Sequence, residues 1–174
     1  ILCDEETCAS PAAAVNLARR LAEVAGARGM VGGQMLDMAI EEAGEGEVDI
    51  GLITRCQRMK TGALIAFSAE AGAIIVDADK DVRTAFEGFA HDLGLCFQIV
   101  DDLLDAVGDE NLTGKRLQKD ADQGKTTFVT ILGIDGARDH AQRLADQAKE
   151  HLEIFGSQAT RLKDCVDYVL ERQS

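Results

Sequence analysis

The sequence predicts an all-α protein, and three observations support this prediction. Proline occurs once among the 174 residues, at Pro11, so little in the composition interrupts helices. Hydrophobic residues make up 46% of the chain, which is enough to bury a core, and Ala and Leu are abundant among them. The apolar residues recur at helical spacing between glycines and polar runs. We therefore expect one domain, or one large piece of a domain.

The order of the helices follows from caps and breakers. Ser10 is a potential N-cap and Pro11 suits a first turn, which places the first helix at Pro11–Ala25. A second helix is expected at Met30–Ile40, where the glycine run Gly29, Gly32, Gly33 indicates close packing or ligand approach. Later helices are expected from Ile50 to about Ala71, from the cap Asp79 to Val107, at Gly133–Phe155 and at Thr160–Arg172, with polar loops at 41–47 and 111–124.

Charge and cysteine content exclude several classes of protein. The formal net charge of −13 argues against nucleic-acid binding, which needs clustered Lys and Arg in excess. Five cysteines without C-x-x-C spacing predict neither a disulfide framework nor a zinc site. The sequence shows no export signal and no apolar stretch of about 18 residues, so we expect a cytoplasmic protein with reduced thiols and no membrane insertion.

An acidic cluster near the end of the long central helix is the strongest chemical signal. Asp101, Asp102 and Asp105, together with Gln98, fall within about 100° of arc on a helix that is otherwise apolar. Such a helix is buried on most sides, which predicts that the acids point into a cavity. Carboxylates at this spacing repel one another, so we expect a hard cation, Mg²⁺ above all, sharing its ligands with phosphate oxygens. The alternative is a solvated acidic face.

A basic loop follows this helix. Lys115, Arg116, Lys119 and Lys125 gather positive charge around Asp120, and such a loop could hold an anion against the metal. Considered alone, the segment is more simply explained as a solvated charged loop. The triplet Gly124-Lys125-Thr126 is not a phosphate-binding P-loop, because Lys119 replaces the required glycine and no strand precedes it.

Together these blocks resemble the polyprenyl diphosphate synthases. The second aspartate-rich region of that family is matched by Phe97-Gln98-x-x-Asp101-Asp102-x-x-Asp105, followed by Gly108-Asp109, Thr113-Gly114-Lys115, Asp120 and Gly124-Lys125-Thr126. Two further blocks match in the correct order, Gly32-Gly33-Gln34-x-x-Asp37 and Lys60-Thr61-Gly62-Ala63-Leu64. The resemblance spans essentially the whole chain and is closest to bacterial farnesyl diphosphate synthases.

The resemblance implies a fold and an activity. The fold is the isoprenoid synthase bundle of helices around a central cavity, of which residues 1–174 would be the C-terminal portion of a single domain, usually in a homodimer. The activity is a Mg²⁺-dependent condensation of isopentenyl diphosphate with dimethylallyl or geranyl diphosphate to farnesyl diphosphate, by ionisation, condensation and proton elimination. A geranylgeranyl diphosphate synthase, a noncatalytic prenyltransferase-like subunit and a terpene cyclase remain alternatives; retention of the aspartates argues against the noncatalytic subunit.

The resemblance also implies residue roles. Mg²⁺ would be held on the diphosphate by Asp101, Asp102, Asp105 and Asp120. The diphosphate would be bound by Gln34, Lys60, Lys115 and Lys125, and Asp37 would order the same network. The catalytic residues would be Lys60, Thr61 and Gln98. Without the resemblance, Lys60 and Thr61 would be ordinary helix residues. The first aspartate-rich motif and the isopentenyl diphosphate site lie upstream in homologues. We therefore expect the 174-residue chain alone to be inactive and prone to aggregate, with apolar faces such as Leu64–Val76 open to water.

Overall fold

The computed structural model of the chain describes residues 8, 10–43, 48–107 and 126–172, and within these ranges all regular structure is helical. The elements, in chain order, are α1 (Pro11–Ala25), α2 (Met30–Ala43), α3 (Ile50–Gln57), the π-helical η1 (Arg58–Gly62), α4 (Ala63–Ile75), α5 (Lys80–Val107), α8 (Phe128–His151), the 3-10 helix η2 (Glu153–Ala159) and α9 (Thr160–Glu171). The predicted all-α class is confirmed. No helix in the described ranges is both long enough and apolar enough to cross a bilayer.

The ends of several helices follow directly from local sequence. Ser10 Oγ accepts the backbone N–H of Ala13 at 3.1 Å, and Pro11 occupies the first turn of α1, as predicted. Asp79 accepts the N–H of Val82 at 2.9 Å and so starts α5, also as predicted. Side-chain capping of the free N–H groups thus sets where these two helices begin.

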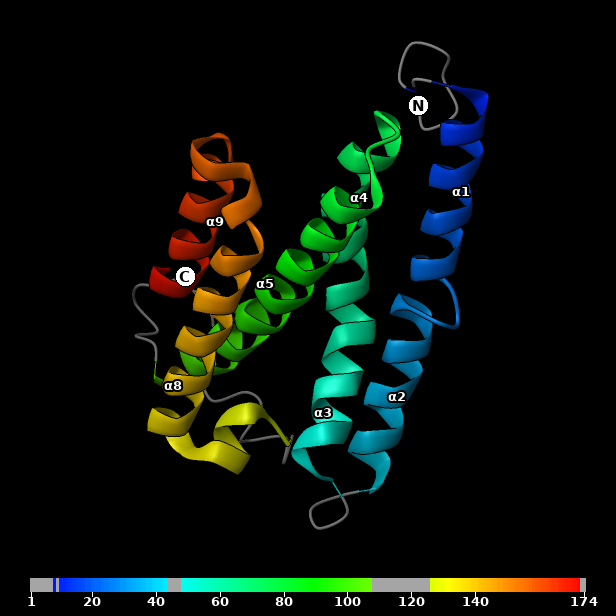
Figure 1. The fold of residues 1–174 in the computed structure, drawn as a ribbon. Coiled ribbons are helices and arrows are strands. Elements are labelled where there is room, and N and C mark those ends of the chain that lie inside the picture. Colours follow the sequence, from blue (N-terminus) through cyan, green and yellow to red (C-terminus); the bar gives the residue numbers. More distant parts are fainter. Residues whose placement is uncertain (1–7, 9, 44–47, 108–125, 173–174) are drawn as a thin grey trace.

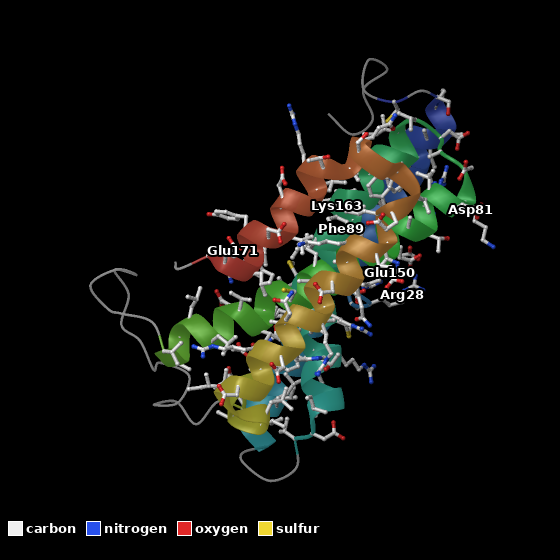
Figure 2. The ribbon with its side chains drawn as sticks, turned by 60° about the vertical axis from the view of Figure 1, so that its left-hand side comes forward. Arg28, Asp81, Phe89, Glu150, Lys163 and Glu171 are labelled. Atoms are coloured by element: carbon white, nitrogen blue, oxygen red, sulfur yellow. The ribbon has the colours of Figure 1, made fainter. Side chains whose placement is uncertain are left out.

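Helix α5 organises the rest of the fold. It runs obliquely through the molecule, with α8 and α9 on one side and α1 to α4 on the other (Figure 1). The core on the α8 and α9 side includes the fully buried side chains of Cys96, Ile99, Phe128 and Val166. Figure 2 shows Phe89 in the interior of this side of the bundle, where it is 3% exposed. Because α5 is covered on two sides by other helices, its polar residues lie on the remaining face.

A second, smaller core joins α1 to α4. Leu17 and Val24 of α1 pack with Phe67 and Ile74 of α4. Beside them, Arg20 donates two hydrogen bonds to the buried carboxylate of Glu70, at 2.9 and 3.1 Å. Such a bidentate pair satisfies a charge that would be costly to bury alone.

Several expectations about helices need correction. Helical structure begins at Phe128, before the helix expected from Gly133, because Thr127 and Thr130 form a capping box; Gly133, with a non-helical φ of +71°, then kinks α8 at the position where the helix was expected to start. The helix expected to end near Ala71 continues to Ile75, and α2 extends to Ala43. The open apolar face expected at Leu64–Val76 was wrong for most of that segment, since α4 packs against α1 and α5 and, among the large apolar side chains of the segment, only Val76 is exposed.

Exposed apolar side chains lie instead on α2. Val31, Met35 and Met38 are 48%, 62% and 47% exposed, and their spacing of four and three residues places them on one side of the helix. Gln34, also exposed, lies beside them in sequence. Among the described residues this is the clearest apolar stripe left uncovered on a helix.

The buried thiol of Cys96 gives a prediction about alkaline stability. Its Sγ lies 3.5 Å from the carbonyl oxygen of Ala141, and burial raises its pKa from 9.0 to about 11, opposed by the charge of Arg172. Because the folded pKa is above the unfolded one, the stabilisation is complete below pH 9 and is lost as the pH rises toward 11. We expect the free energy of unfolding to fall by roughly 2 kcal/mol over this window on account of Cys96.

Urea denaturation at a series of pH values between 8 and 11 measures this effect. Cys96→Ala should remove this part of the pH dependence, whereas Cys165→Ala, at an exposed position, should not. Equal pH slopes for the wild type and Cys96→Ala would contradict the prediction.

Candidate active site

The predicted acidic residues lie on the part of α5 that is not covered by the core. Asp101 and Asp105 are one helical turn apart, so they lie on the same side of the helix. The Asp101 side chain is 64% exposed, and Asp105 is half-buried. Ile99, Val100 and Leu103, on the opposite side, are buried. The apolar back of the helix is as predicted, whereas the described residues leave Asp101 open to solvent instead of enclosing it.

Asp102 has a structural contact that the sequence did not predict. Its Oδ2 accepts the backbone N–H of Phe128, the first residue of α8, at 2.9 Å. A carboxylate at this position neutralises a free N–H and lies at the positive end of the helix dipole. Asp102 therefore joins the C-terminal part of α5 to the start of α8, and one of its oxygens is used in doing so.

Two substitutions should separate capping by Asp102 from any role of its charge. Asp102→Ala removes the acceptor for Phe128 N–H, so we expect a loss of about 1–2 kcal/mol in the free energy of unfolding. Asp102→Asn keeps an oxygen acceptor and should cost less than half as much. Chemical denaturation of both variants measures the difference, and equal losses would show that the negative charge, rather than the acceptor, holds α8.

Lys60 is held by a buried partner. Its ammonium group pairs with the carboxylate of Asp37 on α2, and Asp37 is only 6% exposed. The thiol of Cys56 lies 3.7 Å from the other carboxylate oxygen of Asp37 and 3.6 Å from the carbonyl of Gly33. Lys60 itself remains 29% exposed, so its charge is fixed in position without being sealed from solvent.

The π-helical turn η1 carries Lys60 and Thr61 between two close helix contacts. On one side, a Cβ added to Gly33 of α2 would lie 2.2 Å from the backbone nitrogen of Lys60. On the other side, a Cβ added to Gly94 of α5 would lie 3.2 Å from the Cα of Gly62. The close packing predicted from the glycine run is confirmed at Gly33. A π-turn shifts the direction of the side chains that follow it, and such turns are frequent at functional sites.

The structure therefore brings some of the predicted site residues onto neighbouring elements. Asp37 and Lys60 are in contact, and η1 packs directly on α5 one turn before Gln98, which is half-buried. Thr61 is half-buried on η1, and Gln34 is exposed on α2. Lys115, Asp120 and Lys125 lie outside the described residues.

Arg172, which follows α9 directly, contacts the acidic face of α5. The sequence did not predict this contact. Its guanidinium carbon lies 3.9 Å from the centre of the Phe97 ring, and one terminal nitrogen donates to the Phe97 carbonyl at 3.0 Å. The same nitrogen lies 3.3 Å from Asp101 Oδ1. Figure 2 shows the neighbouring Glu171 at the end of α9. No local pattern could have signalled a contact between residues 71 positions apart.

The carboxylates fit a magnesium ion that arrives with a phosphate ligand. Within the described ranges no three His, Cys, Asp or Glu side chains are grouped as a metal centre. Mg²⁺, however, is commonly bound by one or two carboxylates, with water and substrate phosphate completing its octahedron. Asp101 and Asp105 place two carboxylates, which are groups of this kind, on one side of α5. The arrangement suits a metal bound together with substrate better than a permanent structural ion.

Comparison with known proteins identifies the family of the chain. The family model described as Polyprenyl synthetase matches residues 6–169, and the chain belongs to this family. The farnesyl diphosphate synthase of Escherichia coli (strain K12) is 35% identical over 162 residues, covering 91% of this chain and 53% of that protein.

Solved structures show the same fold. An FPP/GFPP synthase from Zymomonas mobilis, in an apo structure, has 40% identity and a TM-score of 0.82, over 97% of this chain and 55% of that one. A geranyltransferase from Helicobacter pylori, complexed with magnesium and isoprenyl diphosphate, has 27% identity and a TM-score of 0.75, over 92% of this chain and 52% of that one. The chain thus spans about half the length of the proteins it matches.

Proposed function

We propose that the full-length protein is a Mg²⁺-dependent trans-prenyltransferase that condenses isopentenyl diphosphate with an allylic diphosphate. The observation that carries the proposal is the packing of η1 on α5, which places the Lys60 and Thr61 turn beside the helix that bears Asp101 and Asp105. Family membership and the magnesium and isoprenyl diphosphate bound in the Helicobacter pylori relative support it.

The proposed chemistry assigns each group a simple electrostatic task. The allylic C–O bond breaks, the electron pair leaves with the diphosphate, and the double bond of isopentenyl diphosphate supplies the electrons for the new C–C bond before a proton is lost. Magnesium, when bound, would offset the charge growing on the leaving group. The ion would be held by Asp101, Asp102, Asp105 and Asp120. The diphosphate would be held by Gln34, Lys60, Lys115 and Lys125.

Two uncharged groups complete the proposed site. Gln98 and the hydroxyl of Thr61 would face the allylic carbons with their oxygen atoms and so stabilise positive charge. Asp37 would keep Lys60 in place, in line with the ion pair between Lys60 and the buried Asp37 carboxylate. Because Lys60 keeps partial exposure, its ammonium would meet an arriving diphosphate while it stays paired with Asp37.

The product we propose is farnesyl diphosphate, on the strength of overall similarity to the Escherichia coli enzyme. A C20 product, and the C25 product named for the Zymomonas mobilis relative, are the competing chain lengths. A homodimer in the cytoplasm is proposed on the same family grounds.

The test is a product assay on the full-length protein. Labelled isopentenyl diphosphate and geranyl diphosphate with Mg²⁺ should give a C15 diphosphate, and chelation of the metal should abolish it. A C20 product would favour geranylgeranyl diphosphate synthesis, and a cyclic product from geranyl diphosphate alone would favour a cyclase. Activity that requires copurification with a longer homologue would favour a noncatalytic subunit, and the 174-residue chain alone should give no product.

A further inference from the structure

Arg172 places a permanent positive charge next to the proposed metal ligand Asp101. The Arg172 side chain is 11% exposed, whereas the Asp101 side chain is 64% exposed. An ion pair with so exposed a carboxylate, at 3.3 Å, contributes little to stability. The pair by itself therefore does not explain why the side chain of Arg172 is largely covered here.

What holds Arg172 in place is Phe97. The guanidinium stacks on the Phe97 ring and donates to the Phe97 carbonyl, and both contacts are independent of Asp101. Arginine does not lose its proton in proteins, so the charge is always present. The consequence is a fixed cation at the side of Asp101, whether or not that carboxylate has another partner.

We propose that Arg172 is a built-in counter-charge that competes with a divalent metal for Asp101. This inference rests on the proposed function of Asp101 as a metal ligand. By Coulomb's law a unit charge roughly 8 Å from a divalent cation, in a water-like dielectric, weakens the binding of that cation by about fivefold, and more in a drier environment. A bound diphosphate reverses this effect on metal binding, because the guanidinium of Arg172 attracts the diphosphate that the metal accompanies. Arg172 thereby makes metal binding depend on the arrival of the diphosphate.

The experiment measures binding of Mn²⁺, by electron paramagnetic resonance, to the full-length protein without any diphosphate. Arg172→Gln should bind Mn²⁺ about fivefold more tightly than the wild type, whereas Arg172→Lys, which keeps the charge, should stay close to it. Arg161→Gln, an exposed arginine at the other end of α9, controls for net charge and should change nothing. Adding inorganic pyrophosphate should increase Mn²⁺ affinity more in the wild type than in Arg172→Gln.

The outcomes are distinguishable from failure of the proposed function. Unchanged or weaker Mn²⁺ binding in Arg172→Gln would overturn the inference, since a merely structural Arg172 predicts one of those results. If Arg172→Gln is not folded by thermal melting, Arg172→Met, whose apolar chain can still cover Phe97, takes its place with the same expected tightening. Wild-type protein that binds no Mn²⁺ with or without pyrophosphate would overturn the proposed function as well. Binding lost in Asp101→Asn but unaffected in Arg172→Gln would leave the function standing and remove only this inference.

Discussion

Replacing Asp101 by Asn should lower the turnover of the full-length protein by two orders of magnitude or more while the protein stays folded. The Asp101 side chain is 64% exposed, and its contacts with the rest of the protein are slight. The substitution should therefore lower the free energy of unfolding by less than about 1 kcal/mol. The amide has lost the charge that would hold Mg²⁺ on the leaving diphosphate. Removing one electrostatic group that acts on developing charge commonly costs about 10²–10³ in rate.

Steady-state kinetics over a range of Mg²⁺ concentrations would check this, with circular dichroism to confirm the fold. Asp164→Asn, which removes one negative charge at an exposed position of α9, is the matched control and should keep normal turnover. Near-normal turnover of Asp101→Asn at low Mg²⁺ would show that Asp101 is not a metal ligand.

The sequence predicted the parts of the fold that depend on local interactions. Ser10, Pro11 and Asp79 determine helix starts through their own turns, and these starts were predicted correctly. The acidic face of α5 could be predicted for the same reason, because residues three and four apart share a side of any helix. The helical segment from Phe128 to the kink at Gly133 was missed, because a Thr127 and Thr130 capping box is a weaker sequence signal than the glycine at 133.

The contacts between distant residues could not be predicted in this way. Arg172 reaches Asp101 only because α9 packs back on α5, and Asp102 reaches Phe128 only because α8 starts beside it. The π-turn at Arg58–Gly62 lies between α3 and α4 without a break in the helical pattern of the sequence. The sequence therefore gives no sign of it. The glycine run suggested close packing at Gly33 but could not name Lys60 as its partner. These are tertiary interactions, which a single sequence does not encode in any local pattern.

Gly33 and Gly72 should respond in opposite ways to the same substitution. Gly33→Ala puts a Cβ within 2.2 Å of the Lys60 nitrogen and 2.6 Å of the Lys60 Cα, both of them backbone atoms. Backbone cannot rotate away as a side chain can, so α2 and η1 must separate, at a cost of about 3 kcal/mol or more. Gly72→Ala on α4 meets no atom within 4 Å and should instead stabilise the helix by up to about 1 kcal/mol.

Urea denaturation of both variants measures the two changes against the wild type. Separating α2 from η1 also draws Asp37 away from Lys60, so Gly33→Ala should weaken diphosphate binding in the full-length protein as well as stability. Gly72→Ala should leave diphosphate binding unchanged, because α4 beyond Ala71 carries none of the proposed site residues. If Gly33→Ala were as stable as the wild type, η1 would be free to move, and the position of Lys60 would have to be set by its ion pair with Asp37 instead of by close helix packing.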